Sequence, residues 1–245
     1  HRLKQVWFNF PKKEETDEYS VGEGNELTSL LLEIDGLSWN NNTSELLGST
    51  IEFGDIKLHV LAPDHDVAYE NKPKEPDELG VRSDDWYIDL RTLIDNVDDD
   101  DIDEGGTNSQ SIIILAECEG KKLLLPGDST PKKLCDALQS YNKTNGTPLE
   151  LDFMKLPHHG STRNVTKNIL NEVTCSNFII STKKNNKYYF PNKETIAKLI
   201  RYRDSADKAI NVYFNYQESL DVLGITAEEL TENNINLNVC NEFNF

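Results

Sequence analysis

The second half of the chain alternates short apolar runs with helix-forming stretches, and this alternation constrains the fold more than any other feature. Five strands are predicted there, at 111–117, 121–127, 151–156, 176–182 and 209–216. The first two, SIIILAE and KKLLLPG, are almost continuously apolar, as buried central strands of a sheet are. Strands that alternate with helices along the chain predict an α/β fold.

Three helices are predicted between these strands. Thr130 and Pro131 are typical of an N-cap and a first helical residue, so a helix begins at Pro131. A short helix is expected within 165–173, and Pro191 opens another that runs to about residue 203. In this last helix we expect the apolar positions, Ile196, Leu199 and Ile200, to be buried against the sheet.

The first hundred residues are less regular. The pattern predicts a strand at 6–10, an amphipathic helix over 26–36 that ends at Gly36, and a hairpin over 51–63. Residues 64–108 are rich in Pro, Asp, Gly and Asn, which indicates a long acidic surface excursion. We therefore expect one domain over 1–245.

Composition excludes some classes of protein. The 245 residues are 37% hydrophobic and carry a net charge of −18, without an apolar run near the roughly 20 residues of a membrane helix. The four cysteines form no CxxC pair, which favours a reducing, cytoplasmic location. The chain does not begin with Met, and we expect that a front portion of a longer protein is missing.

The charge is unevenly distributed. Residues 84–104 carry 10 acidic and 1 basic side chains, which predicts a solvated loop. A calcium site is the alternative, but the Asp run lacks the spacing and the glycine of an EF-hand. Residues 155–208 hold 11 basic against 4 acidic side chains. This segment suits an anionic substrate and equally suits a solvated face.

Reactive side chains follow two of the buried strands. Asp128 comes after the turn Pro126-Gly127, and the pair His158 and His159 comes after Pro157. Residues just past the carboxyl ends of strands are where α/β proteins bind ligands, and carboxylates with imidazoles suit Zn²⁺ or Mn²⁺. The alternatives are a turn or helix-capping role for the Asp and a capping role for the His pair.

The motifs SIIILAECEGKKLLLPGD, LDFMKLPHHGST and SNFIIST, in this order, resemble the second half of a metallo-β-lactamase-fold hydrolase. The most similar branch is that of the ComEC-type competence metallohydrolases of bacteria. NSQS at 108–111 fits the same pattern, and the resemblance covers about residues 105–216. LPHHGS and LLLPGD together make a fairly specific pair.

This resemblance implies a four-layer αββα sandwich with a metal centre at one edge. Asp128 would be a metal ligand, while His158 and His159 are candidates for ligand and for transition-state contact. The implied cofactor is zinc or manganese, with two ions in the complete site. A metal-bound hydroxide would attack an ester or phosphodiester, with nucleic acid among the substrates that the family suggests.

Two departures from the family pattern favour an alternative function. The early His-x-His/Asp-x-Asp-His motif is absent, because His1, His59 and His65 do not form it and PDHD at 63–66 is expected to be a loop. Phe190 stands where the family has a histidine before the last helix. The alternative is a degenerate, non-catalytic subunit that acts in assembly or sensing with partner proteins. A dedicated nucleic-acid-binding module would need a basic stripe that no helix here has.

Overall fold

The computed structural model describes residues 4–7, 26–27, 29–40, 43–64, 84–105, 108–146, 148–186 and 188–243. The strands are β1 (Gln5–Trp7), β2 (Ser38–Asn40), β3 (Thr50–Phe53), β4 (Ile56–Ala62), β5 (Ile113–Cys118), β6 (Lys121–Leu125), β7 (Leu149–Glu150), β8 (Phe153–Lys155), β9 (Val173–Thr174), β10 (Asn177–Ile180), β11 (Ile210–Phe214) and β12 (Ile235–Val239). The α-helices are α3 (Leu90–Asp95), α4 (Pro131–Asn145), α5 (Lys167–Asn171), α6 (Lys193–Tyr202), α7 (Gln217–Asp221) and α8 (Ala227–Glu232).

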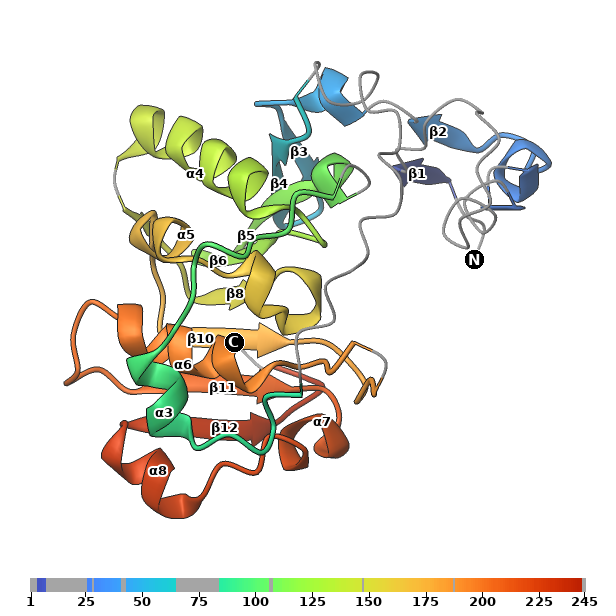
Figure 1. Cartoon of the computed structure of the whole chain (residues 1–245). Coiled ribbons are helices and arrows are strands. Elements are labelled where there is room, and N and C mark those ends of the chain that lie inside the picture. The colour runs from blue at the N-terminus through green and yellow to red at the C-terminus, as the bar shows by residue number, and fades with distance from the viewer. Residues whose placement is uncertain are drawn as a thin grey trace.

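An eight-stranded mixed sheet organises the fold, in the order β12-β11-β10-β8-β6-β5-β4-β3 (Figure 1). The five strands from β12 to β6 run parallel to one another, and β5, β4 and β3 continue the sheet as antiparallel neighbours. The carboxyl ends of β6, β8, β10 and β11 therefore meet at the same edge. This confirms the α/β class.

The helices α3, α4, α5 and α6 lie along one face of the sheet (Figure 1). A row of side chains beneath them crosses the strands in register, and each is at most 4% exposed: Leu115, Leu124, Met154, Phe178 and Val212. Residues from α4, α5 and α6 complete this core. It is the main hydrophobic contribution to stability, because burying one such side chain contributes roughly 1.5–3 kcal/mol.

The opposite face of the sheet is also apolar. Side chains alternate along a strand, so the neighbours of the buried row point the other way: Ala116, Leu123, Phe153, Ile179 and Tyr213. These side chains are only half-buried. Phe243 packs against Phe153 and Tyr213, with ring centroids 4.8 and 5.1 Å away. Within the described ranges there is one large sheet, and the four-layer sandwich stays a prediction.

Most predicted elements are present. The hairpin of β3 and β4, the strands β5, β6, β8, β10 and β11, and the start of α4 at Pro131 with Thr130 as N-cap are confirmed. Ile196, Leu199 and Ile200 of α6 are at most 7% exposed, as expected. Of the predicted strand at 6–10, residues 6 and 7 belong to β1 and the rest lies outside the described residues, as do His1 and His65.

Residues 84–105 differ from the solvated loop expected from their charge. They include α3, which packs against α6, and several of their carboxylates are held by the basic segment. Asp99 Oδ1 lies 2.9 Å from Lys198 Nζ, and Asp101 Oδ1 accepts a hydrogen bond from Arg163 Nε at 2.9 Å. We call residues 98–103 the acidic strap. It crosses α6, where the Asp98 N–H donates to Glu194 Oε1 at 3.0 Å and Asp99 pairs with Lys198.

The strap has a buried cationic anchor. The Lys198 side chain is fully buried, and its ammonium also donates to the backbone carbonyls of Thr162 and Val165 at 2.9 and 3.0 Å. An ammonium in the interior is stable only when it is paired and hydrogen-bonded. The ion pair with Asp99 therefore ties the acidic strap to the helical layer.

No helix among the described residues is long and apolar enough to cross a membrane.

Candidate active site at the sheet edge

The two turns singled out in the sequence lie side by side. They follow the adjacent parallel strands β6 and β8, and the backbone N–H of His158 donates to the carbonyl of Gly127 at 3.2 Å. Gly127 has φ +60°, and a Cβ there would lie 3.2 Å from the Cβ of Ser111. The N–H of Asp128 donates to Ser111 Oγ at 3.2 Å. Ser111 and Gly127 together shape the turn that presents Asp128.

The His pair has an unusual backbone conformation. His158 has φ +43° and His159 has φ +60°, a region that non-glycine residues rarely occupy. Gly160 follows with φ +79°, and a Cβ there would meet Ile180 at 3.3 Å. Backbone strain of this kind, about 1–3 kcal/mol per residue, is concentrated at functional sites. These two positive φ angles place the imidazoles of His158 and His159 at the same edge of the sheet.

His159 has a defined hydrogen bond. Its Nδ1 lies 2.8 Å from the backbone carbonyl oxygen of Ser181, at the end of β10. A carbonyl can only accept, so Nδ1 carries the proton and Nε2 keeps its lone pair. This arrangement is usual for metal-binding histidines, whose second nitrogen is held by a carbonyl or a carboxylate. His159 therefore fits as a ligand through Nε2.

His158 contacts a residue that sequence reasoning missed. Its Nδ1 lies 3.5 Å from Oδ2 of Asp103, a carboxylate that belongs to the acidic strap and is 7% exposed. Burial raises the pKa of Asp103, but hydrogen bonds from His158, Asn164, the Gly105 amide and Asn108 outweigh it. The pKa of this carboxyl consequently lies well below its usual range. The acidic composition of the strap was visible in the sequence, but its contact with the His pair was not.

Lys155 is a second residue missed from sequence. Its ammonium donates to the Leu156 carbonyl at 3.2 Å. Burial lowers the pKa of Lys155, and the opposing attraction comes from the Asp128 carboxylate. Lys155, on the half-buried face of the sheet, thus adds a positive charge that attracts the Asp128 carboxylate after β6.

Phe190 covers the histidines from one side. Its ring centroid is 5.3 Å from that of His158 and 6.1 Å from that of His159. Tyr188 stacks on the same phenyl ring at 6.0 Å. The position that the family resemblance assigns to a histidine thus provides an apolar wall.

The structure brings Asp128, His158 and His159 to one edge, but it does not assemble a full metal centre from them. Among the described residues, no group of three or more His, Cys, Asp and Glu side chains is placed to hold a metal ion. The chemistry of the donors fits zinc or manganese, and the free Nε2 of His159 fits a ligand. Metal binding by these residues remains a prediction.

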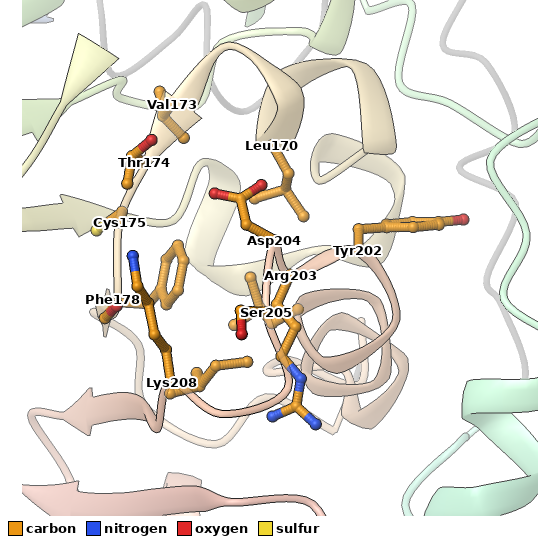
Figure 2. Close-up of a pocket in the computed structure, with 13 residues that line it drawn as sticks. Leu170, Val173, Thr174, Cys175, Phe178, Tyr202, Arg203, Asp204, Ser205 and Lys208 are labelled. Carbon is orange, nitrogen blue, oxygen red and sulfur yellow. The ribbon is translucent and has the colours of Figure 1, made fainter. Parts of the chain in front are cut away.

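A small pocket lies away from this edge, where β10 and β11 begin (Figure 2). Its volume of about 40 Å³ suffices for a water molecule or two, not for a substrate. Cys175 lines it and donates to the Asn177 carbonyl at 3.2 Å. Burial raises the pKa of the Cys175 thiol to about 12, so this thiol is unreactive at neutral pH.

Comparison with known proteins gives a limited match. No family model matches the chain. The chain is 28% identical over 120 residues to Recombination protein 2 of Haemophilus influenzae. The matched stretch covers 47% of this chain and 14% of that protein, so this chain corresponds to only a small part of it.

Proposed function

We propose that this chain is part of a metal-dependent hydrolase of the metallo-β-lactamase fold that cleaves a phosphodiester. The observation that carries the proposal is the meeting of two turns at one sheet edge, through the hydrogen bond from His158 to Gly127. It brings the turn that carries Asp128 beside the turn that carries the His pair. A carboxylate and imidazoles at the carboxyl ends of parallel strands are a donor set suited to Zn²⁺ or Mn²⁺.

Each side chain has a role in this proposal. Asp128 and His159 would hold the cation, His159 through the nitrogen that Ser181 leaves free. When bound, the cation would act as a Lewis acid on the phosphodiester and lower the pKa of a water molecule. His158 would contact the reacting phosphate through Nε2. Phe190 would exclude water from one side of the imidazoles.

The open sheet face supports the four-layer sandwich. Its apolar row, defined by Ala116, Leu123, Phe153, Ile179 and Tyr213, is half-buried, whereas the row under the helices is almost fully buried. An apolar sheet face is stable in water when another layer covers it. A second sheet packed there would give the αββα arrangement, with the candidate site at the edge between the two sheets.

The proposed substrate is a nucleic acid strand. The similar Haemophilus influenzae protein is named for recombination, a process that acts on nucleic acid. The basic segment supports an anionic substrate only in part, because Arg163 and Lys198 are occupied by carboxylates of the acidic strap. Lys155, whose ammonium interacts electrostatically with the Asp128 carboxylate, would supply a positive charge at the proposed site.

Metal analysis tests the proposal. The purified protein, incubated with Zn²⁺ or Mn²⁺ and desalted, is expected to retain at least about one ion per chain, and Asp128→Ala should lose it because a carboxylate ligand is removed. Elemental analysis by mass spectrometry gives the stoichiometry. The matched control is Asp136→Ala, which removes an exposed carboxylate on α4 that pairs with Lys132. Equal metal content in the wild type and Asp128→Ala would contradict the proposal.

A non-catalytic subunit is the second candidate, and one observation favours it. Phe190 packs on both imidazoles in place of the histidine that the resemblance expects. In that case the protein would bind no metal ion even at millimolar Zn²⁺, and Asp128→Ala would leave its binding to partner proteins unchanged. The same metal analysis therefore separates the two functions.

A further inference from the structure

We infer that Asp103 is a positioning residue for His158, holding its imidazole with the Nδ1 proton toward the strap and Nε2 toward the substrate. The inference rests on the proposed function of the His pair, and it makes the acidic strap part of the site. The contact joins a residue of the strap to one of the predicted site residues, at 3.5 Å between Oδ2 and Nδ1.

The surroundings of the Asp103 carboxylate consist of hydrogen-bond donors. Oδ2 accepts from the side-chain amides of Asn108 at 2.7 Å and Asn164 at 2.8 Å, and Oδ1 accepts from the Gly105 N–H at 2.8 Å. A carboxylate surrounded in this way is an acceptor only. An imidazole nitrogen that faces it is favourably placed only when that nitrogen carries the proton.

Asn108 creates the competing arrangement. Its side-chain nitrogen also lies 3.5 Å from His158 Nδ1, so it could donate there if the imidazole carried its proton on Nε2 instead. The shorter bond from Asn108 to Asp103 and the negative charge of the carboxylate both favour the proton on Nδ1. The two tautomers present Nε2 to the substrate differently: with a lone pair when the proton is on Nδ1, and as an N–H donor when the proton is on Nε2.

The strap holds Asp103 rigidly enough for this role. The Asp103 N–H donates to the Arg163 carbonyl at 3.0 Å, and Arg163 in turn binds the Ile102 carbonyl and the Asp101 carboxylate at 3.0 and 2.9 Å. These bonds fix the backbone that leads into Asp103, and the Gly105 N–H, which donates to Oδ1, fixes the backbone that follows it. A partner held in this way orients an imidazole without itself touching the substrate.

The test reads the tautomer of His158 directly. Two-bond ¹H–¹⁵N spectra of the imidazole rings at a pH where they are neutral are expected to show Nδ1–H for His158 in the wild type. Asp103→Ala should change His158 to the Nε2–H form, with the Asn108 amide donating to Nδ1. Asp103→Asn, which keeps an oxygen acceptor, should retain Nδ1–H. The control Asp100→Ala removes an exposed carboxylate of the same strap and should change nothing.

Two results would overturn the inference: an Nε2–H tautomer in the wild type, or an unchanged Nδ1–H tautomer in Asp103→Ala. If the alanine variant does not fold, the wild-type spectrum still decides. Folding is checked by circular dichroism.

Kinetics give the second readout. With Zn²⁺ or Mn²⁺ and bis(p-nitrophenyl) phosphate, Asp103→Ala is expected to lower kcat about 10- to 100-fold with little change in KM, and Asp103→Asn to recover part of the loss. If Asp103 had a purely structural role, Asp103→Ala would leave kcat per folded molecule unchanged. That result would contradict the inference. If the wild type itself hydrolyses nothing, the proposed function fails, while the tautomer still reports on Asp103.

Discussion

Replacing Asp99 by alanine is expected to lower the free energy of unfolding by about 3–4 kcal/mol, which is typical when a buried charge loses its ionic partner. The physical reason lies with Lys198, whose side chain is fully buried and has its ammonium 2.9 Å from Asp99 Oδ1. Without Asp99 the ammonium keeps only the Thr162 and Val165 carbonyls, which do not neutralise its charge. Urea denaturation measures the loss.

A second variant separates the charge effect from lost packing. In Asp99→Ala/Lys198→Met the buried cation is replaced by an apolar side chain of similar length, so the double variant should be more stable than Asp99→Ala alone. Asp100→Ala removes the neighbouring exposed carboxylate and should change stability by less than about 0.5 kcal/mol. Equal stabilities for Asp99→Ala and Asp100→Ala would show that the strap does not depend on this ion pair.

Asp85 is expected to make the protein less stable as the pH rises. This carboxyl is 7% exposed, and its Oδ2 accepts from the Glu194 N–H at 2.7 Å, at the start of α6. Burial raises its pKa to about 6, with a smaller contribution from the Glu194 carboxylate, while backbone hydrogen bonds oppose the shift. The folded protein therefore holds this proton more tightly than the unfolded chain, whose pKa is about 4.

The sign of the effect follows from this difference. Below about pH 4 the Asp85 carboxyl is protonated in both states and costs nothing, whereas between about pH 4 and 6 its ionisation increasingly favours the unfolded chain. A shift of about two pKa units corresponds to about 3 kcal/mol. Asp85→Asn, which cannot ionise, should therefore gain about 3 kcal/mol relative to wild type between pH 4 and pH 7.5.

Urea denaturation at the two pH values gives this difference, and the comparison with wild type cancels the other titrating groups. Asp100→Asn, at an exposed position, should follow the wild-type curve. If the free energy of unfolding of Asp85→Asn and of wild type changed in parallel with pH, the ionised Asp85 would not be destabilising.

The opposite trend belongs to Asp103, whose lowered pKa gives stability above about pH 4 that is lost as the pH falls further.

Patterns in the sequence predicted the strands, and the turns that carry the candidate site residues, because both depend on local properties. Apolar runs give β6 and β8, and Pro126-Gly127 after β6 and Pro157 shortly after β8 fix the turns that present Asp128 and His158. In a parallel sheet, carboxyl ends necessarily share an edge. Only the observed strand order β6–β8 established that these two turns are adjacent.

The acidic strap shows what the sequence could not supply. A run of aspartates has the same composition whether it is solvated or packed against cations, so local reasoning favoured the loop. Its partners lie far along the chain: Asp99 pairs with Lys198, and Asp103 contacts His158. Pairings over such separations depend on the packing of α3 and the strap across α6, which has no signature in the sequence near either partner.

The sequence by itself therefore determined the α/β class and the residue types offered at the sheet edge, since hydrophobic periodicity and turn chemistry are properties of neighbouring residues. The tertiary structure decided which of those side chains are oriented and by what: His159 by the Ser181 carbonyl, and His158 by Asp103. The physical reason is that hydrogen bonds and ion pairs between distant segments form only after the sheet has brought those segments together.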